Sequence, residues 1–236
     1  MSNNFFRFKK FTIRQEGCAM KVGTDGCLLG SWFDCKHCKR ILDIGCGTGL
    51  ISIMAAQRSN ARITGIEIDK DAAQKAIENA ADSPWSERIT IENIDIFKYN
   101  TDEKFDSVVS NPPYFVNSMK CDDSSRTLAR HSDSMQSNKF FKKIKELLLP
   151  QGKVSIIIPV DISGEWKESA KEYGFFPNRI SHIKTTPRKA PKRVMIEFLQ
   201  NENHTIDEND IVLETEPGKY SKEAETLLRD FYLKIE

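Results

Sequence analysis

The chain has 236 residues, of which 39% are hydrophobic and 29% charged, and this length and composition suit one soluble α/β domain. Its formal net charge of +1 excludes a polycation. No run of residues approaches the roughly 20 apolar residues that a membrane-spanning helix needs. The first residues lack the charged-then-apolar layout of a signal peptide, so we expect a cytoplasmic protein.

Residues 1–35 precede the first predicted strand and combine basic, aromatic and glycine residues. Four cations alternate here with four phenylalanines, and the cations are Arg7, Lys9, Lys10 and Arg14. Such a mixture favours contact with nucleic acid over a merely solvated face. Several glycines between residues 17 and 30 indicate turns or backbone close to a ligand, and we see no helical periodicity.

The cysteines are scattered, and only Cys35-Lys36-His37-Cys38 has the spacing of metal ligands. No second Cys/His pair follows at the distance that a zinc site needs. We therefore predict no metal and interpret the cysteines as reduced thiols.

From residue 40 onward, short apolar runs alternate with amphipathic segments. The pattern predicts strands over residues 40–44, 62–68, 89–94, 105–110 and 153–159, and helices over residues 49–58, 70–81, 136–149 and 162–173. This alternation favours an α/β fold with a mostly parallel sheet and helices on both faces. Two final strands over 179–183 and 193–199 lack an intervening helix and predict an antiparallel edge hairpin, which gives seven strands in all. A closing amphipathic helix is predicted over 221–234.

We expect a single domain over residues 1–236. Within it, residues 1–35 form an N-terminal extension that covers the side where ligands bind. Residues 201–236 form a C-terminal extension that contains the closing helix.

The segment Asp43-Ile44-Gly45-Cys46-Gly47-Thr48-Gly49 joins the first predicted strand to its helix. Glycines let the backbone approach a ligand, and the N-terminus of the helix offers free N–H groups. A dinucleotide fingerprint would need glycine at position 50, which is Leu50. The carboxylate of Asp43 suits an ammonium group better than a pyrophosphate, so both features disfavour a dinucleotide.

Two further acids lie at the next two strand ends: Glu67 at the end of the second predicted strand and Asp95 just past the third. Glu67 could accept hydrogen bonds from both hydroxyls of a ribose, as acids in this position do in nucleotide-binding folds. Asp95 could accept a hydrogen bond from an adenine amino group, with Ile96 or Phe97 against the ring. Ligands gather at the carboxyl ends of strands in such sheets, so we expect these residues to form one site.

The fourth predicted strand ends in Asn111-Pro112-Pro113-Tyr114. The prolines fix φ and lack N–H donors, so the Asn111 side chain and the Pro112 carbonyl point outward as acceptors. Two acceptors can hold both hydrogens of a ring-conjugated amine and turn its lone pair toward a methyl carbon. Tyr114 offers a flat surface on which an extruded base could stack. A thiolate mechanism is not indicated, because Pro113 stands where its cysteine would be.

Later segments also predict contact with a polyanion. Arg130-His131 lies in the polar loop after the fourth strand. A second basic cluster contains Lys184, Arg188, Lys189, Lys192 and Arg193, whereas residues 202–216 are acidic. If these cations grip RNA phosphates, binding should weaken as salt rises.

From Arg40 to about Leu199 these motifs resemble the class I S-adenosylmethionine-dependent methyltransferases. The resemblance implies a Rossmann-like sheet and S-adenosylmethionine as cofactor, held by Gly45, Gly47 and Gly49 at the methionine part, Glu67 at the ribose, and Asp95 with Ile96 at the adenine. The Asn-Pro-Pro-Tyr motif is similar to that of amino-methyltransferases that modify adenine N6, cytosine N4 or the glutamine amide of release factors.

Residues outside the core resemble one family, the bacterial methyltransferases that modify N6 of adenosine 37 beside the anticodon of a valine tRNA. Residues 20–32 match its M-K-V-G-T-D-G-x-L-L-G-x-W segment, residues 8–13 its opening, and residues 229–233 its ending. The resemblance implies that Thr24 and Asp25 help to close the cofactor pocket. It also implies a tRNA anticodon stem-loop as partner, contacted by the basic residues Lys9, Lys10, Arg130, Arg188, Lys189, Lys192 and Arg193. We expect no contact with a membrane and no obligate protein partner.

Three alternatives remain. A release-factor glutamine methyltransferase shares both core motifs, but usually carries a separate N-terminal helical domain for which this chain has little room. A non-catalytic RNA-binding module could retain the fold, although the intact Asn111, Pro112 and Tyr114 argue against it. Methylation of another RNA, such as ribosomal RNA, is the third.

Overall fold

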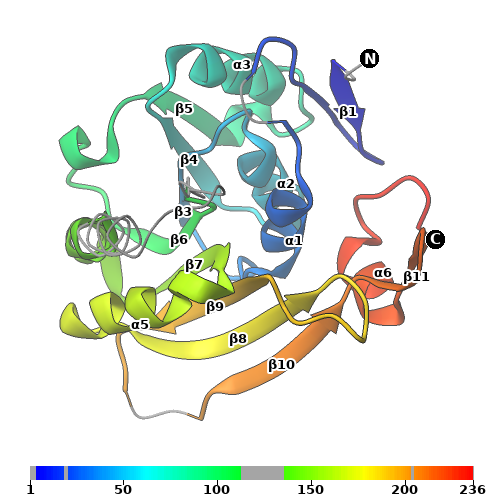
Figure 1. Cartoon of the computed structure of the whole chain (residues 1–236). Coiled ribbons are helices and arrows are strands. Elements are labelled where there is room, and N and C mark those ends of the chain that lie inside the picture. Colours follow the sequence, from blue (N-terminus) through cyan, green and yellow to red (C-terminus); the bar gives the residue numbers. More distant parts are fainter. Residues whose placement is uncertain (1–3, 19–20, 113–135, 203–204, 236) are drawn as a thin grey trace, which may run out of the picture.

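The computed structural model describes residues 4–18, 21–112, 136–202 and 205–235. Its centre is an eight-stranded sheet in the order β5-β4-β3-β6-β7-β9-β8-β10 (Figure 1). The strands are β3 (Arg40–Ile44), β4 (Arg62–Glu67), β5 (Ile89–Asn93), β6 (Phe105–Ser110), β7 (Leu148–Pro159), β8 (Phe176–Lys184), β9 (Arg193–Leu199) and β10 (Asp207–Val212). Neighbouring strands are parallel, except that β9 is antiparallel to both β7 and β8.

The predicted fold class is confirmed, with two differences in the sheet. The antiparallel strand β9 lies between β7 and β8 instead of at the edge, because the chain crosses to the outer position first and returns through a hairpin. The eighth strand, β10, was not predicted. Its sequence is polar and only Ile211 in it is buried, as an exposed edge strand allows.

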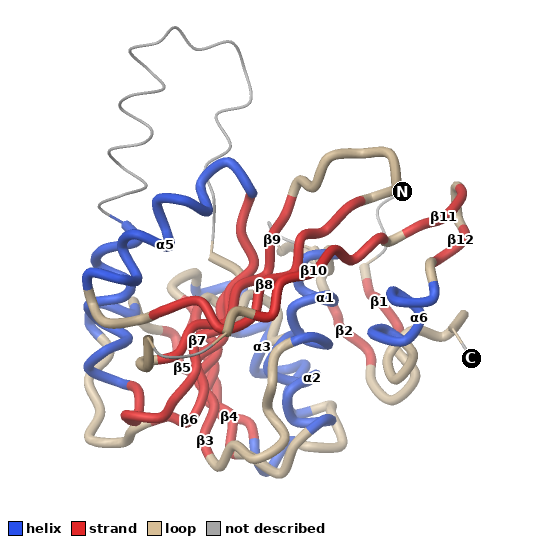
Figure 2. The backbone as a smooth tube through the Cα atoms, turned by 90° about the horizontal axis from the view of Figure 1, so that it is seen from below, coloured by secondary structure: helices blue, strands red, loops and turns tan. Residues whose placement is uncertain are grey.

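Helices cover both faces of the sheet (Figures 1 and 2). On one face lie α1 (Thr24–Trp32), α2 (Leu50–Arg58) and α3 (Lys70–Ala81); on the other lie α5 (Ser163–Glu172) and a helix over residues 136–147. Successive strand residues point to opposite faces, so Ile41 joins the core under α1 and α2, whereas Leu42 joins the core under α5. Short 3-10 turns cover Ser86–Arg88, Ile96–Lys98 and Val160–Ile162.

Helix α1 was not predicted, because its glycines suggested turns. They serve close packing instead. A Cβ on Gly26 would lie 3.1 Å from Cδ2 of Leu50, and one on Gly30 would lie 2.6 Å from Sδ of Met54, both on α2. The helix is also buried along nearly its whole length, so it has no polar face that would give a helical periodicity.

The two ends of the chain pack against each other beside α1. The N-terminal hairpin of β1 (Phe5–Arg7) and β2 (Thr12–Arg14) meets the segment that follows α6 (Lys222–Leu228). Phe8 and Phe11 are buried, and Phe11 lies edge-on to Phe231. Lys9 Nζ donates to the carbonyls of Arg229 at 2.8 Å and Ile235 at 2.6 Å. These aromatic residues therefore join the termini, and the predicted closing helix ends earlier, at residue 228.

A small hairpin, β11 (Glu214–Glu216) with β12 (Lys219–Tyr220), leads from β10 into α6. Among the described residues, no helix combines the length and the hydropathy needed to cross a bilayer.

Candidate functional site

A cavity of about 300 Å³ opens where β3, β4, β5 and β6 end. Seven of the predicted site residues line it: Gly45, Gly47, Glu67, Asp95, Ile96, Asn111 and Pro112. The cavity therefore brings the glycine loop, both downstream acids and the start of the second motif to one place.

The glycine loop adopts a backbone that only glycine takes easily. Gly45, Gly47 and Gly49 have φ values of 68°, 55° and 81°. The N–H groups of Gly45 and Cys46 donate to the Ile66 carbonyl at 2.8 and 3.1 Å, which fixes the loop to the end of β4. Gly49 lies outside the cavity wall, and a Cβ there would be 3.3 Å from Cβ of Ala76 on α3. The first two glycines thus face the cavity, while the third lets α2 pack closely on α3.

Glu67 is the last residue of β4 and joins two loops. Its Oε2 accepts a hydrogen bond from the N–H of Gly47 at 2.8 Å, and its Oε1 accepts one from the N–H of Asp69 at 2.9 Å. The carboxylate is half-buried in the cavity wall. It is therefore held beside the glycine loop with its remaining lone pairs available.

Asp95 caps the 3-10 turn that follows β5, where its Oδ1 accepts from the N–H of Phe97 at 3.0 Å. Beside it, two large apolar side chains on the cavity wall stand in solvent: Ile68 is 69% exposed and Phe97 46% exposed. Together with Ile96 they form an apolar surface next to a carboxylate, which is the setting that a flat ring with an amino group requires.

Asp43 points away from the cavity. Because it alternates with Ile44, its side chain faces α2, where Oδ2 accepts a hydrogen bond from Ser52 Oγ at 2.6 Å. The side chain is 1% exposed, and among the described residues Oδ1 has no hydrogen-bond partner. This burial raises the pKa of Asp43 to about 7, although the Ser52 hydroxyl opposes the shift.

The second motif begins at the end of β6, next to the glycine loop in the sheet. Asn111 is half-buried and Pro112 is buried, and both line the cavity. Ser110 Oγ, just before them, donates to the Ile44 carbonyl at 2.8 Å. The predicted residues Tyr114 and Arg130 lie outside the described residues.

The far wall of the cavity was missed by the sequence analysis. Phe140 and Trp166, whose ring centroids are 5.3 Å apart, come from the helix over 136–147 and from α5, and Gln136 lies beside them. Both rings are nearly buried, so in sequence they follow the same apolar pattern as ordinary core residues. No local signal separates them from the core.

Thr24 and Asp25 were predicted to close over the cofactor, but the structure does not bring them to the cavity wall. They begin α1, and Asp25 Oδ2 accepts from Arg193 Nε at 2.8 Å. Arg193 itself was predicted to contact tRNA. The two residues bind each other because α1 and β9 both begin at the end of the sheet where the parallel strands finish.

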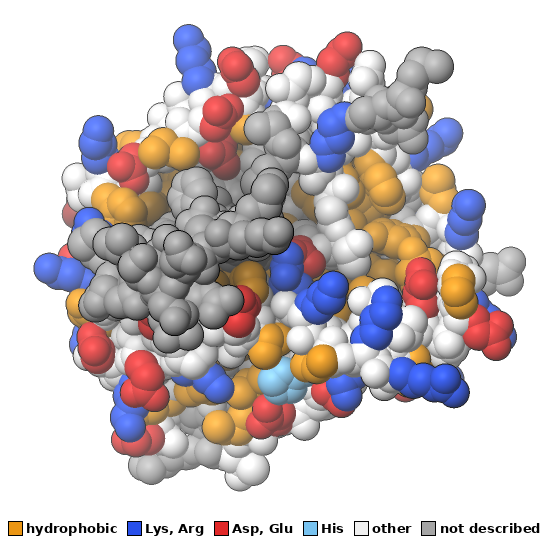
Figure 3. Space-filling view, viewed as in Figure 1, with side chains coloured by type: hydrophobic (Ala, Val, Ile, Leu, Met, Phe, Trp, Pro, Cys, Tyr) orange, Lys and Arg blue, Asp and Glu red, His pale blue; other side chains and the backbone are white. Residues whose placement is uncertain are grey.

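The basic loop between β8 and β9 lies on the same side of the sheet as the cavity, at the carboxyl ends of the parallel strands. This follows because Arg193 pairs in register with Pro159 at the end of β7. Arg188, Lys189 and Lys192 on this loop are exposed and form no ion pair with any described residue. Lys10 is exposed as well, whereas Lys9 is occupied by the C-terminal carbonyls. Figure 3 shows Lys and Arg side chains bordering a hydrophobic patch on this face.

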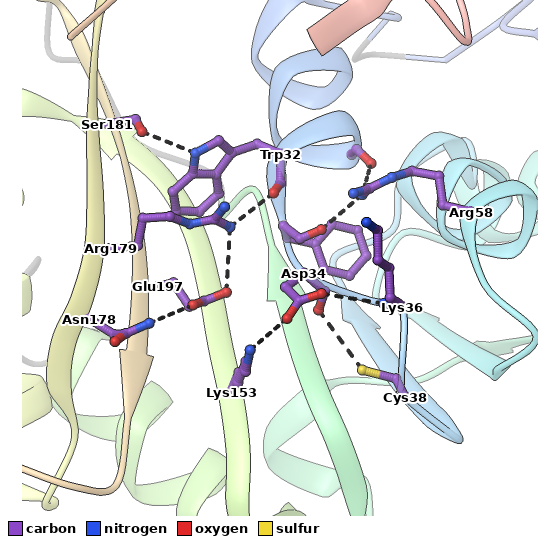
Figure 4. Close-up of polar contacts among 12 residues, drawn as sticks. Trp32, Asp34, Lys36, Cys38, Arg58, Lys153, Asn178, Arg179, Ser181 and Glu197 are labelled. Atoms are coloured by element: carbon purple, nitrogen blue, oxygen red, sulfur yellow. Dashed lines mark hydrogen bonds and ion pairs between the residues drawn. The ribbon is translucent and has the colours of Figure 1, made fainter. Parts of the chain in front are cut away.

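The other end of α1 is also fixed to the β8–β9 hairpin (Figure 4). Trp32 Nε1 donates to Ser181 Oγ at 3.0 Å, and the Arg179 guanidinium lies 3.8 Å from the centroid of the indole ring. Arg179 also donates to the Trp32 carbonyl at 2.9 Å and lies 3.5 Å from the buried carboxylate of Glu197. Contacts at both ends therefore tie α1 to the hairpin that carries the basic loop.

Cys35 and Cys38 lie in the turn after α1. Burial raises the pKa of both thiols, that of Cys38 to about 12, so they stay protonated at neutral pH. Within the described part of the chain, no group of three or more His, Cys, Asp or Glu residues is placed to hold a metal ion.

Comparison with known proteins gives a consistent result. The methyltransferase domain family matches residues 36–226. The chain is 45% identical to a tRNA1(Val) (adenine(37)-N6)-methyltransferase of Bacteroides thetaiotaomicron, with all of both chains covered. It is 42% identical to the protein of that name from Trichodesmium erythraeum, with 99% of this chain and 100% of the relative covered.

Solved structures agree on the fold. A predicted O-methyltransferase from Agrobacterium tumefaciens matches with a TM-score of 0.69 at 20% identity, covering 88% of this chain and 96% of that one. TrmN from Thermus thermophilus matches with a TM-score of 0.51 at 18% identity, covering 68% and 43%. At such identities the similarity concerns the architecture alone.

Proposed function

Because the chain belongs to the tRNA1(Val) (adenine(37)-N6)-methyltransferase family, we propose that its cavity is where a methyl group passes from S-adenosylmethionine to N6 of adenine 37 in a valine tRNA. One observation supports this most directly. A single cavity is lined by the glycine loop, by two acids at consecutive strand ends and by the Asn-Pro acceptors. The glycine loop and the two acids suit the cofactor, and the Asn-Pro acceptors suit an exocyclic amine.

The residues present fit S-adenosylmethionine. We propose that its methionine part lies against Gly45 and Gly47, that Glu67 accepts from the ribose hydroxyls, and that Asp95 accepts from the adenine amino group, because all four residues line the cavity. Ile96, Ile68 and Phe97 offer the apolar surface for the adenine ring. When bound, the cofactor supplies a methyl group activated by its attachment to a sulfonium.

We assign Asp43 an indirect role. Its buried carboxylate stands behind the glycine loop with Oδ1 unpartnered among the described residues, so it favours a positive charge nearby. The methionine ammonium supplies such a charge. Asp43 would then act through the field it exerts on the loop and not as part of the cavity wall.

Asn111 and Pro112 orient the amine. We propose that the Asn111 side-chain oxygen and the Pro112 carbonyl each accept one of the two hydrogens on adenine N6. Held this way, the nitrogen lone pair points into the cavity and the amine loses part of its conjugation with the ring. The proton leaves after the nitrogen has gained the methyl group, so no base of tuned pKa is needed. Tyr114 is proposed as the stacking surface.

The substrate is a tRNA, and we propose that its anticodon stem-loop lies across the basic loop. Arg188, Lys189 and Lys192 are exposed there, with Lys10 as a further candidate and Arg130 outside the described residues. Asp25 and Arg193 hold the base of this loop. We also propose that the protein acts in the cytoplasm, where tRNA is found, and that it needs no obligate protein partner.

The test is methyl transfer to an unmodified valine tRNA transcript, followed by nucleoside analysis and mapping of the modified position. We expect N6-methyladenosine at position 37. A transcript with guanosine at that position is the matched control and should gain no methyl group. Methylation of glutamine in an added release factor, or transfer to ribosomal RNA instead of tRNA, would overturn the proposal.

A further inference from the structure

We propose that Ser110 is a positioning residue, which holds the Asn111–Pro112 acceptors against the cofactor loop through its hydrogen bond to the Ile44 carbonyl. The inference rests on the proposed function, because it concerns how the same site keeps its two halves in register. Ser110 is buried, with 1% of its surface exposed, and it lines the cavity together with Ile44.

The bond lies where the two catalytic loops separate. Ser110 and Ile44 are the last paired residues of the neighbouring parallel strands β6 and β3. After Ile44 the chain turns into the glycine loop, whose first N–H groups bond toward β4. After Ser110 it enters the Asn-Pro-Pro segment, where Pro112 has no N–H with which to extend the pairing.

The Ser110 hydroxyl therefore adds a side-chain cross-link at the last point where the loops are still adjacent. Its Oγ donates to the Ile44 carbonyl at 2.8 Å, one residue before Gly45 on one side and one residue before Asn111 on the other. The bond is thus only one residue away from the glycine loop that would hold the cofactor and from the Asn111 acceptor that would hold the amine. Losing it should let the acceptors drift relative to the cofactor without removing any group that binds the cofactor.

Methyl transfer is sensitive to such a drift, because a displacement of about 1 Å in a positioned group can lower the rate by roughly a hundredfold. Cofactor affinity depends instead on the glycine loop, Glu67 and Asp95, which have their own contacts. A positioning role therefore predicts a fall in kcat with little change in KM for S-adenosylmethionine.

The same strand provides a matched control. Ser107 is also buried in β6, but among the described residues its hydroxyl has no hydrogen-bond partner, and it faces the opposite side of the sheet. Ser107→Ala removes the same atom from the same strand without touching the cavity. We expect it to leave kcat and both KM values essentially unchanged.

The experiment measures steady-state kinetics on valine tRNA for Ser110→Ala, Ser110→Thr, Ser110→Val and Ser107→Ala. Threonine and valine have nearly the same shape and differ in the hydroxyl, so this pair isolates the hydrogen bond. We expect kcat to fall by about tenfold to a hundredfold in Ser110→Ala and Ser110→Val, and to recover most of its value in Ser110→Thr. Wild-type kcat in Ser110→Ala, or equal rates for threonine and valine, would overturn the proposal.

A second readout does not depend on the substrate. With S-adenosylhomocysteine bound, hydrogen–deuterium exchange in the peptides around residues 44–47 and 110–112 should be faster in Ser110→Ala than in Ser107→Ala. If wild-type protein fails to methylate tRNA while this difference persists, the proposed function is wrong and the positioning role stands. If tRNA is methylated and neither kcat nor exchange changes, the positioning role is wrong. Should Ser110→Val fail to fold, recovery of kcat in Ser110→Thr but not in Ser110→Ala supports the hydrogen bond, and equally low kcat in both overturns the proposal.

Discussion

Two regions meet at the same edge of the sheet and differ in how their residues are placed. In the first, the ends of β3 to β6, the predicted residues lie at or close to the end of a strand, and most of them line one cavity. In the second, formed by α1 and the β8–β9 hairpin, predicted residues bind each other across more than 150 positions, as Asp25 and Arg193 do. Strand ends of a parallel sheet converge by topology, whereas long-range ion pairs depend on tertiary packing that no local pattern encodes.

The largest expected effect lies in the first region. Asn111→Ala should lower kcat by about a hundredfold to a thousandfold, because one of two fixed acceptors for the amine is lost. Cofactor affinity, measured by calorimetry, should stay close to that of wild type. Asn100→Ala is the control, since Asn100 is an exposed residue before β6, at the opposite edge of the sheet. Near wild-type turnover in Asn111→Ala would show that the acceptors are elsewhere.

The next effect tests the basic loop. Charge reversal at Lys189 and Lys192 should weaken tRNA binding by about tenfold near physiological salt and reduce the slope of log K against log salt by about two. Lys9→Ala is the matched control, because Lys9 Nζ is bound to the C-terminal carbonyls and should affect stability instead of the salt slope. If Lys9→Ala changes the slope and the double reversal does not, the tRNA lies over the N-terminal hairpin.

The contrast between the regions also explains what the sequence could predict. The boundaries of α2, α3 and β6 follow from apolar periodicity, and the glycine loop and Glu67 follow from their positions at strand ends. Helix α1 was missed because a helix buried on all sides has no polar face, and its glycines resemble a turn until Leu50 and Met54 are seen against them. The sequence predicts a nucleic-acid surface at Phe8 and Phe11, whereas both are buried between the two ends of the chain, because aromatic residues beside cations give the same pattern in either setting.

A smaller effect distinguishes the two roles suggested for Asp25. If Asp25 anchors the basic loop, Asp25→Asn should weaken tRNA binding by roughly two- to fivefold and leave cofactor binding unchanged, as suits a pair that is about 30% exposed. The exchanged pair Asp25→Arg with Arg193→Asp should recover part of the loss. If Asp25→Asn instead raises KM for S-adenosylmethionine and leaves tRNA binding unchanged, Asp25 helps to close the cofactor pocket. The start of α1 would then belong to the cofactor site and not to the tRNA site.

The smallest effect concerns Asp43, which belongs to the first region by sequence but points toward α2. Burial raises its pKa to about 7 in the folded protein, against 3.8 for the exposed group, so folding favours the protonated carboxyl. The stability that this group contributes is therefore fully present below about pH 4 and is lost as the pH rises through about 7. Asp43→Asn cannot ionise and can still accept from Ser52, so its Tm should decline less between pH 5 and 8 than the Tm of wild type, by a few degrees if about 1 kcal/mol is involved.

Ser52→Ala removes the donor that opposes the rise in the pKa of Asp43. It should make the decline in Tm steeper than in wild type, as measured by thermal melts across that range. A constant difference in Tm between wild type and Asp43→Asn from pH 5 to 8 would mean that Asp43 stays ionised throughout. Asp43 would then carry its negative charge at every pH in that range, as the proposed role beside the methionine ammonium requires.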